Sequence, residues 1–248
     1  MFKLMKYESL RKIKLLLISL VIIGLFEIGI LFTIYKGGYS LGLTAFLIWF
    51  LGVGGLIFAL VDSITMYSHD LHRKPGYMLF LTPNNSYKII GSKLLISLIE
   101  VAVGAVIYVS LNMLNYSIIY RLYFNDPDSP ARKILDFITN IEHFPSPSEA
   151  LMILLSLIVT WFTLILTIYL SITISKTLLS NVKFGGLFSF IFFIILYVII
   201  IFIHSKLVGS INGDSIMVNN IINISYSTFV SILLYIGSST LLSKGVDL

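Results

Sequence analysis

Six long apolar stretches constrain this chain more than any other feature of its sequence, because stretches of this length fold stably only outside water. They cover residues 13–35, 41–67, 94–118, 150–174, 184–203 and 224–242. A helix needs about 20 apolar residues to cross the hydrocarbon core of a bilayer, and each stretch reaches about that length. The sequence therefore predicts an all-α integral membrane protein, with six transmembrane helices in a single domain over residues 1–248.

The composition excludes a soluble catalytic domain. Hydrophobic residues make up 57% of the chain and charged residues 12%, against about 25% charged residues in a soluble domain. The segments between the apolar stretches are far shorter than a usual domain of about 100 residues. There is no cysteine, which excludes disulfides, thiolate nucleophiles and cysteine-bound metals. We expect a multi-pass protein of the plasma membrane that is not itself an enzyme.

The basic residues predict the orientation of the chain. The first apolar stretch is too long for the core of a cleaved signal peptide and is expected to remain as an anchor. With the N-terminus in the cytoplasm, 12 of the 17 Lys and Arg residues lie inside and five outside, which follows the positive-inside rule. Both termini are then cytoplasmic. The net charge of +5 is spread over loops next to the membrane, which favours contact with anionic lipid and not with nucleic acid.

Three connecting segments carry further patterns. The cytoplasmic segment 68–93 is long and basic, and Thr82 followed by Pro83 predicts a helix start that leads into the third span. Ser148 with Glu149 is expected to cap the fourth span. The outer segment 204–223 regains apolar residues after a polar stretch, which is typical of a short interfacial or re-entrant helix.

Taken together, these segments resemble one family of membrane proteins. The chain has a basic N-terminal segment (KLMKYESLRK), a long loop ending in LTPNNSYKIIGSKLL before the third span, a short basic loop (SKTLLSNVK) after the fourth, and a broken apolar segment between the last two spans. In this layout it resembles the membrane (permease) subunits of bacterial type-2 ABC exporters. The stretch LTPNNSYKIIGSKLL carries the resemblance at residue level.

The resemblance implies a division of labour between chains. The N-terminal segment would lie along the inner membrane surface, and the loop after the second span would dock into a separate ABC ATP-binding subunit as a coupling helix. Two ATP-binding subunits would bind ATP and Mg²⁺, and a second permease copy, identical or related, would complete the pathway. The residues that this resemblance assigns to ATPase coupling are His69, His72, Arg73, Lys74, Tyr77, Met78, Leu81 and Pro83.

The sequence lacks the motifs of several enzyme classes. No G-x-x-x-x-G-K-[ST] occurs, and the glycine run 52–55 lies inside an apolar stretch, where close helix packing is the favoured interpretation. The four histidines show no H-E-x-x-H spacing, so ordinary loop histidines are favoured over a metal site. The sequence therefore predicts no catalytic residue, no metal site and no cofactor bound by this chain.

Three acidic residues lie within or at the ends of the apolar stretches. A carboxylate at the bilayer centre costs about 2.5 to 3.5 kcal/mol, so it usually faces a cavity or a partner. For Glu27 two interpretations stay open: a functional one, either a polar contact on a translocation path or a proton site, and a structural one, a protonated or hydrogen-bonded packing residue. For Asp62 and Glu100, near the cytoplasmic headgroups, structural ion pairs are favoured. The basic partners expected within reach are Arg73, Lys88 and Lys93.

Two functions from different classes follow. The first is an exporter subunit that moves an amphipathic or hydrophobic substrate outward: a peptide, a lantibiotic-like toxin, a drug or a lipid. The second is a non-transporting membrane scaffold or sensor with the same six-span layout. Recovery of an ATP-binding subunit with the chain from native membranes discriminates between them.

Overall fold

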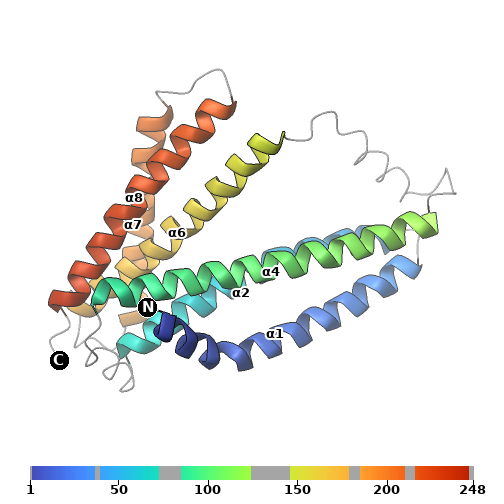
Figure 1. Cartoon of the computed structure of the whole chain (residues 1–248), viewed down its shortest axis with the longest axis horizontal. Coiled ribbons are helices and arrows are strands. Elements are labelled where there is room, and N and C mark those ends of the chain that lie inside the picture. The colour runs from blue at the N-terminus through green and yellow to red at the C-terminus, as the bar shows by residue number, and fades with distance from the viewer. Residues whose placement is uncertain are drawn as a thin grey trace. The chain divides into compact units, whose positions relative to one another are not determined.

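The computed structural model describes residues 2–36, 40–72, 85–123, 146–178, 185–209 and 216–245. These residues form helices throughout, apart from one residue before each of two helices, and contain no strand. The helices, shown in Figure 1, are α1 (Phe2–Lys36), α2 (Ser40–His72), α4 (Ser86–Tyr123), α6 (Pro147–Leu178), α7 (Gly185–Gly209) and α8 (Ile216–Gly245).

All six of these helices are long and apolar enough to cross a membrane. They confirm the prediction of an all-α chain with six membrane-spanning helices. The chain is accordingly described below as a multi-pass membrane protein.

The helices extend beyond the apolar stretches from which they were predicted. The expected loop 68–93 is shorter in the structure, because α2 continues to His72 and α4 already begins at Ser86. The carbonyl of Asn85 accepts hydrogen bonds from the backbone N–H groups of Lys88 and Ile89. The predicted helix start at Thr82 and Pro83 lies outside the described residues. Hydropathy identifies only the apolar part of a helix, which lies in the hydrocarbon core of the membrane. The backbone hydrogen bonds of the helix continue beyond it into polar turns.

A similar extension changes the description of the segment 204–223. Helix α7 continues to Gly209, and residues 216–223 are the first turns of α8, which runs without a break to Gly245. Within the described residues, the apolar positions expected to form a separate interfacial or re-entrant helix therefore belong to α8. Residues 210–215 lie outside the described residues.

The N-terminus of α6 is capped two residues earlier than predicted. The Ser146 backbone N–H donates to Glu149 Oε2 at 2.8 Å, and the Glu149 N–H approaches Ser146 Oγ at 3.4 Å. This is a capping box, with Ser146 as N-cap and Pro147 at the first helical position. Ser148 was expected as the cap. A capping box requires the Glu to follow the N-cap residue by three positions, and of Ser146 and Ser148 only Ser146 has this spacing to Glu149.

The chain divides into two compact units, which are described separately. Unit 1 contains residues Met1–Met5, Leu60–Leu98 and Pro145–Leu248, and unit 2 contains Lys6–Ala59 and Ile99–Phe144. Unit 1 thus holds the C-terminal part of α2, the N-terminal part of α4, and helices α6, α7 and α8. Unit 2 holds most of α1 with the remaining parts of α2 and α4.

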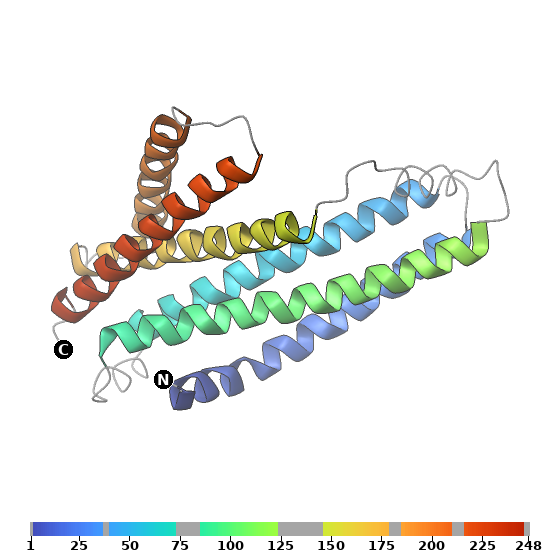
Figure 2. The same cartoon turned by 45° about the horizontal axis from the view of Figure 1, so that its top comes forward.

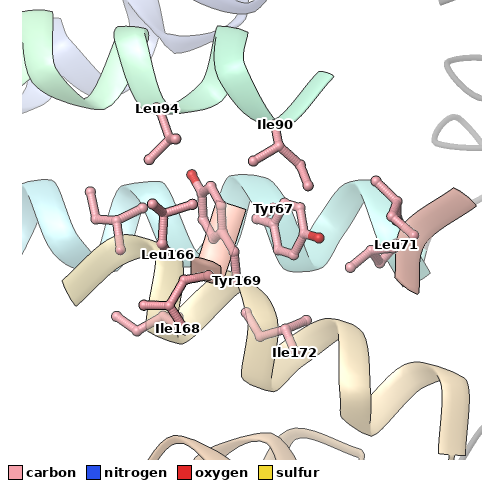
Figure 3. Close-up of a cluster of buried hydrophobic side chains, with 11 residues drawn as sticks. Tyr67, Leu71, Ile90, Leu94, Leu166, Ile168, Tyr169 and Ile172 are labelled. Carbon is pink, nitrogen blue, oxygen red and sulfur yellow. The ribbon is translucent and has the colours of Figure 1, made fainter. Parts of the chain in front are cut away.

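Unit 1 is built around α6, which packs against both α7 and α8. Its core is a cluster of buried apolar and tyrosine side chains from α2, α4, α6 and α8. Figure 3 shows Ile90 and Leu94 of α4 on one side of Tyr67 and Tyr169, and Ile172 of α6 on the other. The two tyrosine rings stack with their centroids 4.1 Å apart.

In unit 2, parts of α1, α2 and α4 lie side by side, as both Figure 1 and Figure 2 show. The Tyr123 hydroxyl donates to the carbonyl of Ile34 on α1 at 2.6 Å. Gly52 is the glycine of the 52–55 run that meets a neighbouring helix, because a Cβ there would lie 3.0 Å from the Tyr108 ring of α4. A Cβ at Gly54 or Gly55 would meet nothing within 4 Å.

Candidate functional site

The residues expected to couple to an ATPase fall on and after the end of α2. His69 is exposed in the last turns of α2, and His72 is the final residue of that helix. The remaining six lie outside the described residues. They are Arg73, Lys74, Tyr77, Met78, Leu81 and Pro83.

A buried ion pair joins the two helices that flank this segment. The Lys93 ammonium of α4 donates to Asp70 Oδ2 of α2, and the two side chains are 1% and 10% exposed. A charged pair out of contact with water persists only where geometry and further hydrogen bonds compensate for desolvation. The ends of α2 and α4 are therefore held together in unit 1. Sequence reasoning missed Asp70, because it was read as part of a polar loop and not as a helical residue.

The same end of α2 is joined to α6 by two tyrosines. The Tyr67 hydroxyl is 2.6 Å from Thr173 Oγ1, and the Tyr169 hydroxyl is 2.8 Å from Ser63 Oγ. Because Thr173 Oγ1 donates to the carbonyl of Tyr169, the Tyr67 hydroxyl is the donor to Thr173. Both rings are fully buried, so stacking and hydrogen bonding act together to fix α2 against α6.

Helix α8 contacts the start of α4 in the same unit. The Tyr235 hydroxyl donates to the carbonyl of Tyr87 at 2.6 Å, and the two rings meet edge to face with centroids 5.8 Å apart. The first turn of α4 is thus fixed to α8, while its third turn is fixed to α2 through Lys93. All these contacts involve the C-terminal part of α2 or the first turns of α4, the two helix ends that flank residues 73–84.

The acidic residues of the apolar stretches have different surroundings. Glu100 forms an ion pair with Lys12 of α1 at 2.8 Å, and not with one of the three partners expected from the sequence. Lys12 lies in the basic N-terminal segment, 88 residues before Glu100. The spacing of residues along the sequence could not predict a pair so far apart. Asp62 is buried in unit 1, next to Ser63, which contacts Tyr169.

Glu27 has a neighbour that the sequence did not single out. The side chain of Asn115 on α4 interacts with its carboxyl group, and both residues belong to unit 2. Asn115 is 2% exposed. The two asparagines of the apolar stretch 94–118, Asn112 and Asn115, were the available signal, since a buried amide in a membrane helix usually has a polar partner on another helix.

The described helices contain no group of three or more His, Asp or Glu side chains arranged to hold a metal ion. No protein-family model, no curated protein and no solved structure matches this chain. The function is therefore argued from the residues themselves.

Proposed function

We propose that this chain is the membrane-spanning permease subunit of an ABC exporter in the plasma membrane. The substrate class is amphipathic or hydrophobic: a peptide, a lantibiotic-like toxin, a drug or a lipid. Two copies of a separate ATP-binding subunit supply the energy, and a second permease copy, identical or related, shares the pathway.

One observation carries this proposal: the helices on both sides of residues 73–84 are anchored to the core of unit 1. Asp70 pairs with Lys93, Tyr67 stacks on Tyr169, and Tyr235 bonds to the start of α4. A partner that displaces residues 73–84 would therefore move α2, α4, α6 and α8 together. A tightly packed bundle transmits such a displacement because it is bistable and not continuously deformable.

The charge of the segment supports the same partner. Residues 73 and 74 are Arg and Lys, and they follow the exposed His69 at the end of α2. In the predicted orientation this basic segment faces the cytoplasm, where an ATP-binding subunit is available and anionic lipid headgroups lie beside it.

Site-specific crosslinking tests the proposal. The tagged chain is purified from native membranes, and co-purifying proteins are identified by mass spectrometry. Single cysteines are then placed at positions 73, 77 and 81 in a chain that has none of its own, and each is labelled with a photo-crosslinker. We expect all three to crosslink to a P-loop ATPase, whereas a cysteine at Lys206 should not, because it lies on the other side of the membrane.

Three results would contradict the proposal or one of its parts. Recovery of the intact chain without any ATP-binding protein would favour the scaffold or sensor function. Crosslinks from Thr177, at the end of α6, with none from positions 73 to 81, would retain the exporter but assign coupling to the other cytoplasmic loop. A single permease copy per complex, without a related second chain, would exclude the dimeric pathway.

A further inference from the structure

The N-terminal part of α1 places its charged residues on two different faces. Glu8 and Lys12 are buried, at 2% and 6% exposure, and Lys12 is paired with Glu100 of α4 at 2.8 Å. Lys6 and Lys14 are exposed. Glu8 is the only acidic residue among the first 26 positions of the chain. Because it is turned inward, the outward face of this part of α1 is basic and has no acidic side chain beside it.

The exposed lysines share their face with apolar side chains. Residues 6, 10 and 14 follow one another at a spacing of four, so Lys6, Leu10 and Lys14 lie on one side of the helix. Tyr7 is 70% exposed and Leu10 is 56% exposed. This combination suits a membrane interface. Tyrosine rings are enriched there, and lysine stems can lie along apolar surface while their ammonium groups reach the headgroups.

The same side of α1 continues into the lipid-facing surface of the helix. Leu17, Val21 and Ile28 follow at helical spacing, belong to the membrane-spanning part of α1, and are each more than half exposed. An exposed apolar face in a membrane span contacts acyl chains. The outward face of residues 6–14 is therefore the end of a lipid-facing surface, and lipid is the partner that both parts of this surface share.

The length of α1 places this face at the depth of the headgroups. The helix has 35 residues and is about 52 Å long, whereas the hydrocarbon core of a bilayer is about 30 Å thick. The apolar stretch of α1 begins at residue 13, and its last residue is the exposed Lys36, so the excess length lies at the N-terminal end. Residues 6–14 thus begin outside the hydrocarbon core and end at its edge, where the lipid phosphates lie.

We propose that the outward face of residues 6–14 is a binding site for anionic phospholipid. Lys6 and Lys14 contact the phosphates, and Tyr7 and Leu10 lie among the glycerol groups and the first carbons of the acyl chains. In the predicted orientation this lipid belongs to the inner leaflet. The site goes beyond the proposed export function and does not depend on it.

Fluorescence quenching of the full-length chain in lipid nanodiscs tests the proposal. A cysteine that carries a fluorophore replaces Ser9, which is exposed beside this face, and the chain has no other cysteine. The discs contain phosphatidylcholine with a minor share of phosphatidylglycerol, and bromine atoms are placed on the acyl chains of one lipid or of the other. We expect brominated phosphatidylglycerol to quench the label well beyond its share of the lipid.

Two double variants with equal loss of charge separate a local site from a general effect of charge. Lys6→Gln with Lys14→Gln should lower the enrichment of phosphatidylglycerol by about fivefold for each lysine, because a basic side chain near an anionic surface contributes about 1 kcal/mol. Lys36→Gln with Arg121→Gln changes exposed residues at the other ends of α1 and α4 and should leave the quenching unchanged. All four side chains are exposed, so both double variants should fold normally.

Three outcomes would overturn the proposal. The first is quenching by the two lipids in proportion to their shares in the wild type. The second is undiminished enrichment of phosphatidylglycerol in the variant that lacks Lys6 and Lys14. The third is a label that neither lipid quenches, because the face would then lie in water and be available to a protein partner instead.

Discussion

A lysine that is 1% exposed, such as Lys93, has to be neutralised where it lies. Asp70 does so from the neighbouring helix, and the pair sits within a core of isoleucine, leucine and tyrosine side chains. A buried pair of this kind contributes little compared with an apolar pair of equal volume, but loss of one member leaves a charge behind in the core. The pair therefore specifies how α2 and α4 are aligned more than it adds stability.

Lys93→Met is expected to destabilise the protein strongly. It removes the ammonium but keeps a side chain of similar length, so the main effect is the loss of one member of a buried ion pair, at a cost of about 3 to 5 kcal/mol. Unfolding of the purified protein in mixed micelles measures this cost.

The double variant Lys93→Met with Asp70→Leu should recover most of that loss, because no buried charge remains. Lys88→Met is the matched control, since Lys88 is exposed in the same helix and should change stability by at most about 0.5 kcal/mol. A double variant no more stable than Lys93→Met alone would show that the pair is not the source of the effect.

The positions of the intramembrane acids could be predicted from the sequence, but their partners could not. Glu27, Asp62 and Glu100 stand out because a charge in an apolar stretch is costly. Glu100 meets Lys12 across 88 residues, which depends on how α1 packs against α4. Asp70 was missed for a different reason: the helix was expected to end before it.

At the scale of the helices, Gly52 is the residue at which α2 and α4 approach closely in the described part of unit 2. Gly52 lies against the Tyr108 ring, whose hydroxyl donates to the carbonyl of Ile48 at 3.3 Å. The sequence pattern correctly indicated helix packing for the run 52–55, but only a structure distinguishes the glycine that faces α4 from the others. Three glycines within four residues have no helical periodicity that would mark one face.

Gly52→Ala should therefore destabilise unit 2, whereas Gly55→Ala should not. The new Cβ at position 52 would lie 3.0 Å from the Tyr108 ring, so the ring must move and its hydrogen bond to Ile48 weakens, at a cost of about 1 kcal/mol. Thermal unfolding of both variants in the same detergent measures the difference. Equal stability of the two variants would contradict the assignment of Gly52 as the packing contact.

Across the part of the molecule that the structure describes, the number and type of the helices could be predicted from hydropathy alone. A span of about 20 apolar residues has few alternatives in a membrane protein, because the backbone hydrogen bonds must be satisfied within the segment. The ends of the helices could not be predicted as well. Residues 68–72 and 86–93 are polar enough to pass for a loop, yet they are helical because the Asp70 and Lys93 pair and the tyrosine contacts hold them.

The predicted orientation can be tested with single cysteines. Cysteines at positions 6, 88 and 176 should react with a membrane-impermeant maleimide only after the membrane is opened. Cysteines at positions 36, 121 and 206 should react in intact cells. Since the chain has no native cysteine, each signal has one source. Labelling of position 6 in intact cells would reverse the topology and remove the cytoplasmic assignment of residues 73–84.

The two ion pairs also have a consequence for the order in which the helices can pair during synthesis. Lys12 and Asp70 precede their partners on α4 by 88 and 23 residues, so both leave the ribosome first. Helices α1 and α2 thus emerge before the α4 residues that form ion pairs with Lys12 and Asp70 in the folded protein. Translation of α4 supplies both Lys93 and Glu100. Neither ion pair can therefore form, and α1 and α2 cannot reach their final alignment with α4, until the third helix has been made.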